Sequence, residues 1–281
     1  MDKLIQTLIS GLSLGSIYAL IALGYTMVYG IAKMLNFAHG DIIMVGAYAV
    51  ITAVFTMGLP PFIAILISIV LCALLGIVIE FLAYRPLRQA QPLAVLITAI
   101  GVSYLLQNLA LLIYGSEQKA FPTIVALPTV HIGGVYIDGI TLATLVVTAV
   151  IMVALSLFIN KTRMGKAMRA VSEDKEAAEL MGISVNRTIT VTFAIGSALA
   201  GVAAIFYGAA YTYIRPTTGA MPGIKAFTAA VFGGILLGVI EQLSKTYIST
   251  LWADAIVFGV LVVVLVVKPT GLLGKKISEK V

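Results

Sequence analysis

The sequence predicts an all-α, polytopic integral membrane protein with about eight to nine transmembrane helices. Hydrophobic residues form 60% of the 281 residues and charged residues 11%, whereas soluble domains have roughly 45–50% and about 25%. The mean hydropathy is +1.09, and the apolar residues fall in long runs. These observations exclude a soluble enzyme and a disordered chain, and a single cysteine excludes a disulfide scaffold. The net charge of +6 is weak support for nucleic-acid binding, because membrane proteins concentrate lysine and arginine in cytoplasmic loops.

Eight apolar runs are long enough to form the helices of such a protein, since a span needs about 20 apolar residues. The runs are 4–34, 42–57, 62–83, 93–113, 139–159, 189–213, 226–240 and 255–267. The first run is not expected to be a cleaved signal, because no strong basic region precedes it and no A-x-A site follows a short apolar core. Turn residues separate the runs, as at Gly58-Leu59-Pro60-Pro61, and Arg85-Pro86 and Lys268-Pro269 end helices.

The basic residues predict which loops face the cytoplasm. Segments 84–92, 160–187 and 268–280 hold 12 of the 18 lysines and arginines, whereas 115–138 has only Lys119 beside two acids. The positive-inside rule places the first three segments in the cytoplasm and 115–138 outside.

Counting spans leaves one inconsistency. Three runs before Arg85 put the N-terminus outside, and three runs after Arg187 would then put the lysine-rich tail outside as well. One more crossing within 216–268 would return the tail to the cytoplasm. Either a run there is broken into two short segments, or a crossing is missing.

The densest polar group among the apolar runs is Asn36-Phe37-Ala38-His39-Gly40-Asp41. A polar, glycine-containing break between apolar helices can line a cavity, because its backbone needs partners other than lipid. Alternatively, it is a short interfacial loop in which His39 and Asp41 cap the next helix, where the helix dipole favours an anion. One histidine and one aspartate are too few ligands for a metal site, and the sequence predicts no cofactor.

Other polar and small residues suggest helix packing. Glu80, Glu241 and Asp254 lie near predicted helix ends, where snorkelling or ion pairing explains them. Glu241 and Lys245 have the i,i+4 spacing of a pair on one helix face. Stripes of small residues predict close helix contacts within one subunit: Gly11, Gly15 and Ala19; Gly234 and Gly238; and Ala194, Ala198, Gly201, Ala204 and Gly208.

Segment 160–187 is the longest charged stretch and predicts a short amphipathic cytoplasmic helix. Ser172 is expected to cap it, with Glu173 and Asp174 in its first turn and Gly182 as its stop. Ala177, Leu180 and Met181 then share an apolar face. That face suits a groove on a cytoplasmic partner or lipid headgroups, and four acidic residues in 173–179 count against anionic lipid.

Within this helix, Glu176-Ala177-Ala178 followed by Gly182 resembles the EAA loop of ABC-importer permeases, which docks as a coupling helix on the ATPase subunit. Together with further segments, it makes nearly the full chain similar to the branched-chain amino-acid permease family of ABC importers. Those segments are 14–30 (LGSIYALIALGYTMVYG), 36–41 (NFAHGD), 84–88 (YRPLR), 225–231 (KAFTAAV) and 269–274 (PTGLLG). In one respect the chain departs from the family, whose members carry a glycine-rich segment resembling GIGSIPGA between the equivalents of Gly234 and Ile235.

The resemblance implies a single permease domain over 1–281, with a coupling loop at 160–187, in the bacterial inner membrane. The implied partners are a second permease, two ATPase subunits, a periplasmic binding protein that delivers Leu, Ile or Val, and the surrounding lipid. The chain lacks the Gly-x-x-x-x-Gly-Lys-Ser/Thr phosphate loop and is not expected to be an enzyme. The expected ATPase-coupling residues are Glu176, Ala177, Ala178, Leu180, Met181 and Gly182. The expected substrate-path residues are Asn36, His39, Asp41, Gly201 and Gly208.

Two other classes of membrane protein are alternatives to an ABC permease. A stand-alone secondary transporter of small amphipathic solutes is expected to show internal repeats and broken helices in both halves, and the sequence has no convincing repeat. An intramembrane enzyme needs a nucleophile and a base, and His39 has no evident serine or cysteine partner.

Overall fold

The computed structural model describes residues 2–124, 127–132, 135–228 and 231–267. The α-helices are α1 (Asp2–Ala32), α2 (His39–Ile51), α3 (Pro61–Ile79), α4 (Pro92–Tyr114), α5 (Gly139–Lys161), α6 (Arg163–Glu173), α7 (Lys175–Leu180), α8 (Val185–Tyr211), α9 (Ala220–Thr228), α10 (Val231–Tyr247) and α11 (Ala253–Val267). Short π-helical turns extend α2 over Thr52–Thr56 and α3 over Glu80–Tyr84, and a 3₁₀ turn follows at Arg85–Leu87. The strands are β1 (Lys119–Ala120), β2 (Val130–Ile132), β3 (Val135–Ile137) and β4 (Tyr213–Ile214).

The structure confirms a polytopic helical membrane protein. Six helical segments are long and apolar enough to cross a bilayer: Lys3–Ala32, His39–Thr56, Pro61–Leu87, Pro92–Tyr114, Gly139–Lys161 and Val185–Tyr211. The described helices of the last third are shorter, with nine, 17 and 15 residues. The expected count of eight to nine spans is therefore not confirmed.

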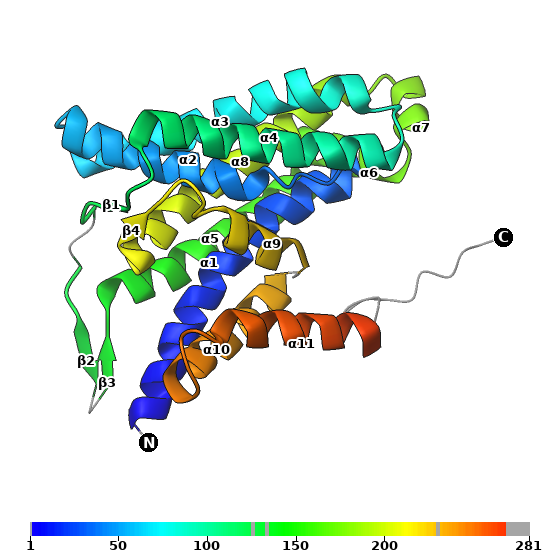
Figure 1. Cartoon of the computed structure of the whole chain (residues 1–281). Helices are drawn as coiled ribbons and strands as arrows, with labels where there is room; N and C mark the ends of the chain where they lie inside the picture. The colour runs from blue at the N-terminus through cyan, green and yellow to red at the C-terminus, as the bar shows by residue number, and fades with distance from the viewer. Residues whose placement is uncertain (1, 125–126, 133–134, 229–230, 268–281) are drawn as a thin grey trace.

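The last third differs from the prediction in one instructive way. The described residues of the apolar run 226–240 are divided between two helices, since 226–228 end α9 and 231–240 begin α10. The sequence offered two explanations for the crossing that the topology lacks within 216–268, and a run divided into two segments is one of them. Figure 1 shows α11 running toward the end of the molecule that carries α7. The lysine-rich tail 268–281 lies outside the described residues.

Helices α2, α3, α4 and α8 lie side by side, and α1 crosses them obliquely toward α10 and α11 (Figure 1). Burial differs sharply among the spans: about three quarters of the most apolar stretch is buried in α1 and α2, but 28%, 17% and 11% in those of α3, α4 and α5. Apolar side chains such as Leu112, Ile113 and Val146 are exposed on the outer three helices, a composition suited to contact with lipid or with another membrane subunit.

Small residues bring α1 and α10 together. A β-carbon on Gly238 would clash with the backbone of Gly15, and one on Gly234 would meet the backbone of Ala19. The order of these contacts shows that the two helices run antiparallel. The glycine stripes therefore pack helices within one subunit, as predicted. Helix α10 also continues without a break through Gly234 and Ile235, where the family resemblance implied additional residues.

The two ends of the bundle differ in character. One end carries α6 and α7, and there the Arg88 side chain contacts Asn186 at the beginning of α8. At the other end, β1 pairs antiparallel with β4, directly after α8. The Gln6 side chain there bonds to the backbone of Tyr136, in the hairpin formed by β2 and β3. Segments 160–187 and 115–138, predicted to face opposite sides, thus lie at opposite ends of α8.

Candidate functional site

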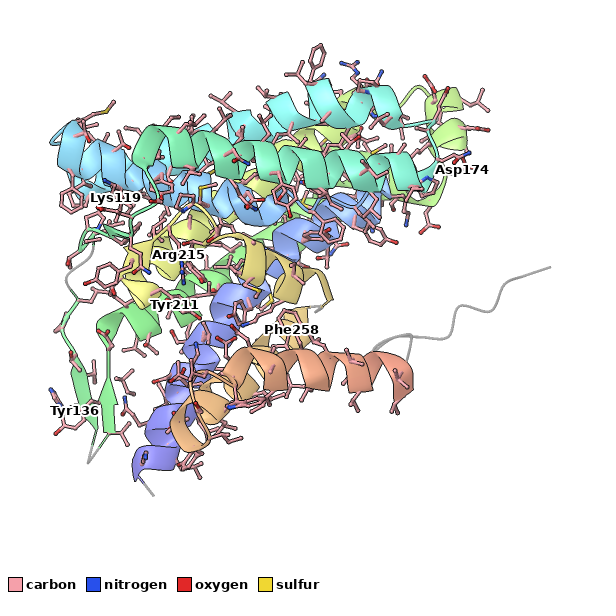
Figure 2. The ribbon with its side chains drawn as sticks, in the orientation of Figure 1. Lys119, Tyr136, Asp174, Tyr211, Arg215 and Phe258 are labelled. Carbon is pink, nitrogen blue, oxygen red and sulfur yellow. The ribbon has the colours of Figure 1, made fainter. Side chains whose placement is uncertain are left out.

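Helix α7 begins at a sharp corner after α6, which Figure 2 marks by Asp174. The residue that caps it is Asp174, whose Oδ1 accepts hydrogen bonds from the amides of Glu176 (2.9 Å) and Ala177 (3.0 Å). The prediction of Ser172 as the cap was wrong, because α6 continues to Glu173 and the Ser172 hydroxyl donates to the carbonyl of Arg169. Gly182 ends the turn with φ +78°, as expected of a helix stop.

The expected coupling residues divide into an inner and an outer set. Ala178 is buried against the bundle, with 4% of its surface exposed, whereas Leu180 and Met181 are 88% and 82% exposed. Glu176 and Ala177 are also exposed. Within the outer set, Leu180 and Met181 form a small apolar knob at this end of the molecule, held on a short capped helix.

Lys175, which the sequence did not single out, ties α7 to the longest helix. Its Nζ donates a hydrogen bond of 2.9 Å to the carbonyl of Ala32, the last residue of α1. The α1 carbonyls at that end have no partner within the helix, so a lysine satisfies one of them and complements the helix dipole. Burial, together with the nearby charges of Arg88 and Lys33, lowers the pKa of Lys175.

The polar segment 36–41 lies inside the bundle rather than on its surface. Asn36, His39 and Asp41 are each at most 1% exposed. Asp41 lies in the first turn of α2, and its carboxylate accepts hydrogen bonds from Ser103 and Gln107 of α4. Burial therefore excludes a solvated interfacial loop, and neither His39 nor Asp41 caps α2, whose N-cap is Ala38. The place of Asp41 in the first turn agrees only with the expected preference of the helix dipole for an anion.

The remaining residues of this segment bind or pack against α1 and α3. The Tyr84 hydroxyl donates to Oδ1 of Asn36 at 3.1 Å. The His39 ring lies edge-on to Tyr25, with centroids 5.8 Å apart, and a β-carbon on Gly24 would meet that ring. The segment thus joins helices that are distant in sequence.

The two glycines expected on the substrate path lie elsewhere. Gly201 faces the backbone of Ile69 and the side chain of Cys72 on α3. Gly208 faces the ring of Phe121 and lines a pocket of about 260 Å³ between α8 and the segment that follows β1. The five expected path residues are therefore not gathered in one place.

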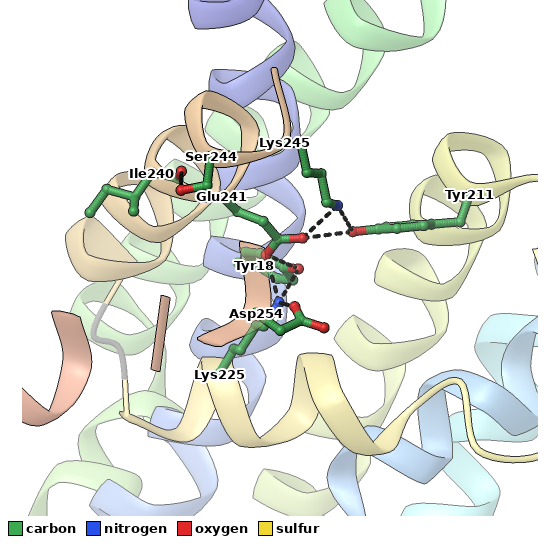
Figure 3. A network of polar contacts seen from close by, with 8 residues as sticks. All are labelled: Tyr18, Tyr211, Lys225, Ile240, Glu241, Ser244, Lys245 and Asp254. Carbon is green, nitrogen blue, oxygen red and sulfur yellow. Dashed lines mark hydrogen bonds and ion pairs between the residues drawn. The ribbon is translucent and has the colours of Figure 1, made fainter. Parts of the chain in front are cut away.

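A second polar cluster, which we call the ion network, comprises Tyr18, Tyr211, Lys225, Glu241, Lys245 and Asp254 (Figure 3). Glu241 Oε2 pairs with Lys225 Nζ at 2.6 Å and accepts the Tyr18 hydroxyl at 2.8 Å. Its Oε1 pairs with Lys245 Nζ at 2.7 Å and accepts the Tyr211 hydroxyl at 3.3 Å. Lys225 also contacts Asp254 Oδ1 at 2.7 Å.

Ion pairing thus accounts for all three acids singled out in the sequence. The i,i+4 pair of Glu241 and Lys245 is confirmed. Glu80, whose side chain is fully buried, pairs with Arg88 and accepts the Thr190 hydroxyl at 2.7 Å. Sequence reasoning missed Lys225, which is only 2% exposed. A lysine amid apolar residues was the available signal, since a charge within a membrane protein needs a partner.

Comparison with known proteins identifies the family. The profile of the family described as "Branched-chain amino acid transport system / permease component" matches residues 7–266. The chain is 44% identical over 300 aligned residues to the high-affinity branched-chain amino acid transport system permease protein BraD of Pseudomonas aeruginosa, with 99% of this chain and 98% of BraD covered. It is 42% identical to the permease proteins LivH of Salmonella typhimurium and Escherichia coli, over 99% of this chain and 97% of each relative.

The alignment with BraD is longer than this chain of 281 residues, so BraD has residues at positions where this chain has none. No solved structure gave a significant match. The profile match and three alignments that each span nearly the whole chain agree. The chain therefore belongs to the family of permease components of branched-chain amino acid transport systems.

Proposed function

We propose that this chain is a permease subunit of an ABC importer for leucine, isoleucine and valine. A periplasmic binding protein delivers the amino acid, and separate ATPase subunits power its passage. The observation that carries the proposal is α7, a capped helix whose exposed Leu180 and Met181 project from one end of a polytopic chain of this family.

Docking explains why α7 exposes apolar side chains away from the membrane-spanning helices. Burying a leucine or methionine side chain contributes about 1.5–3 kcal/mol, so Leu180 and Met181 favour insertion into a groove of an ATPase subunit by the helix-in-groove mode. Because Lys175 binds the end of α1, a displacement of α7 would be transmitted to the longest helix. ATP binding can then bias two conformations of the permease, provided that the ATPase contacts differ between them.

The assembly we propose has a second permease subunit beside this one and two ATPase subunits at the end of the molecule that carries α7. The concentration of lysine and arginine at the α6–α7 end supports a cytoplasmic location for α7 and the tail, in a bacterial inner membrane. The absence of a phosphate-loop motif in the chain agrees with ATP hydrolysis by other subunits.

The docking residues are tested by adding a charge to the outer set. We expect Ala177→Asp to abolish leucine uptake and co-purification of the ATPase subunits, because a carboxylate opposes burial in an apolar groove. Gly182→Glu is expected to have the same effect, to which strain of the backbone at φ +78° also contributes. Ser184→Asp is the matched control: it adds the same charge nearby, but at the N-cap of α8, where aspartate is favourable.

Membrane insertion, measured by the amount of protein in purified membranes, is expected to be unchanged in all three variants. Normal uptake and normal co-purification in the first two variants would contradict the docking assignment. Uptake that follows an ion gradient without ATP would indicate a secondary transporter instead.

We also propose that Asn36, His39 and Asp41 contribute to the path, and that Gly201 and Gly208, which lie elsewhere on α8, belong to other parts of it. Their support is the burial of three polar side chains where α1, α2 and α4 meet. Removing a hydrogen-bonded carboxylate costs about 1.5–3 kcal/mol, so Asp41→Ala is expected to lower the maximal uptake rate about tenfold. Uptake is measured at saturating binding protein, for Asp41→Ala and His39→Ala. An unchanged maximal rate in both would refute this role.

A further inference from the structure

A large pocket at the end of α8 remote from α7 has no role in the coupling argument. Its volume is about 750 Å³, within the range of about 300–1,000 Å³ that is typical of small-molecule sites. Residues from α8, α9, α10 and α11 line it, together with β4 and the segment between β4 and α9. It is distinct from segment 36–41, whose residues do not line it.

The pocket extends from the end of the molecule into its interior. Gln118 and Arg215 lie at its outer part, next to β1 and β4, and Tyr18, midway along α1, lies at its inner part. Figure 2 shows Arg215 and Tyr211 close together beside β4. A solute that enters from the side opposite α7 would therefore pass Arg215 before it reaches the inner part of the ion network at Tyr18.

Most charges in the ion network are already compensated within the protein. Both oxygens of Glu241 are engaged, by Lys225 and Tyr18 on one side and by Lys245 and Tyr211 on the other. This carboxylate has little remaining capacity for a ligand. Its role is to hold the two lysines and two tyrosines in place.

Two charges of opposite sign remain open. Asp254 uses Oδ1 for Lys225, but its side chain is 53% exposed. Arg215 is exposed, and its guanidinium has no ion-pair partner among the described residues. Of the charged residues that line the pocket, three are cationic and two are anionic. The pocket's own residues therefore have a net charge of +1.

The walls offer an apolar surface next to these charges. The rings of Tyr207 and Tyr211 stack with centroids 4.4 Å apart, and Tyr213, Met221 and Pro222 also line the pocket. Aromatic rings bury aliphatic groups well and also attract cations over their faces. The pocket thus combines an open cation, an open anion and an apolar wall.

We infer that this pocket binds the zwitterionic α-amino acid on its way through the permease. Arg215 receives the α-carboxylate, Asp254 receives the α-ammonium, and the tyrosine rings cover the aliphatic side chain. Arginine suits the first task because its planar fork matches a carboxylate. The inference rests on the proposed function, because it takes the transported solute to be an amino acid.

The test is direct binding of tritiated leucine to the whole importer complex in nanodiscs, without binding protein, by equilibrium dialysis. We expect Arg215→Gln and Asp254→Asn each to weaken leucine binding about tenfold or more, the size of one charge-assisted hydrogen bond. Asp254→Glu, which keeps the charge, is expected to retain most of the affinity. Glu117→Gln removes an exposed acid at the same end of the molecule and serves as the matched control.

A second measurement protects the test against misfolded variants. The maximal leucine uptake rate at saturating loaded binding protein is expected to fall in both variants, and the amount of assembled complex recovered in the nanodiscs is measured for each variant to detect misfolding. Wild-type leucine binding and uptake in both Arg215→Gln and Asp254→Asn would overturn the inference. So would a wild-type complex that imports leucine but binds none directly.

Two further outcomes distinguish this inference from a docking surface for the binding protein and from a failure of the proposed function. If the variants bind leucine normally but lose affinity for the binding protein, the pocket is a docking surface for that protein and the inference is wrong. If the wild-type complex takes up no branched-chain amino acid, the proposed function fails. Dialysis with a panel of other tritiated α-amino acids then tests the pocket by itself.

Discussion

At the scale of single residues, Glu241 is the centre of the polar interior. Its carboxylate is 1% exposed and compensates two lysines. A buried ion pair contributes little net stability, because desolvation opposes the attraction, but removing one partner costs about 3–5 kcal/mol. Removal of one charged member of the ion network would therefore leave another buried charge with less compensation.

We predict that Glu241→Gln destabilises the protein by about 3–5 kcal/mol, because it leaves Lys225 and Lys245 with less compensation. The measurement is the temperature at which the detergent-purified protein loses its monodisperse peak in size-exclusion chromatography. Glu179→Gln, at an exposed position on α7, is expected to behave like the wild type. An equal transition temperature for both variants would contradict the role assigned to Glu241.

Lys175 makes a second prediction at the same scale. Lys175→Met keeps most of the side-chain volume but removes the hydrogen bond to Ala32, which is worth about 1.5–3 kcal/mol for a charged donor. We expect the ATPase subunits to remain bound while the leucine transported per ATP hydrolysed falls about tenfold. Lys166→Met, at an exposed position of α6, is the control, and equal ratios in both variants would exclude transmission through Lys175.

At the scale of elements, the contact between α1 and α10 depends on backbone proximity. Gly238 of α10 lies against Gly15 of α1, so the two helices meet there without intervening side chains. Such close approach favours dispersion contacts in a bilayer. Tyr18 of α1 and Glu241 of α10 bond across the same pair of helices. Packing and ion pairing therefore act on one interface.

We predict that Gly238→Leu disrupts this interface, since overpacking costs about 1–3 kcal/mol or more and the backbone of Gly15 leaves no room for a β-carbon. Gly30→Leu on α1 is the matched control, because a β-carbon there would meet no atom within 4 Å. The measurement is the resistance of each purified variant to limited proteolysis. Equal resistance of the two variants would show that the helices do not pack as described.

At the scale of the whole molecule, the two ends of α8 serve different partners in our proposal. The end with α6 and α7 presents the apolar knob of Leu180 and Met181. The opposite end carries the β2–β3 hairpin and the opening of the large pocket near Arg215. The ATPase subunits and the binding protein would thus act on opposite ends of the same bundle.

This arrangement predicts opposite labelling of two introduced cysteines. A membrane-impermeant maleimide is expected to modify Tyr136→Cys in intact spheroplasts, but Met181→Cys only after the membrane is opened. Both positions are exposed, at 59% and 82%, and the native Cys72 is fully buried, so the unmutated protein gives the background. Labelling of Met181→Cys in intact spheroplasts would reverse the proposed orientation.

The sequence by itself determined the membrane class, six of the helical segments and the presence of a short helix that ends before Gly182. Those features follow from local chemistry: long apolar runs, turn residues and a glycine that tolerates φ +78° at Gly182. Only the tertiary structure decided that Lys225 meets Glu241 and Asp254, that Lys175 reaches Ala32, and that Asp174 rather than Ser172 caps α7. Lys175 and Ala32 are 143 residues apart in the chain. Lys225 lies 16 residues before Glu241 and 29 before Asp254, on a separate helix from each, and the cap depended on where α6 ended. Hydrophobic periodicity specifies which segments are helices, but the partner of a buried charge is fixed only when those helices pack.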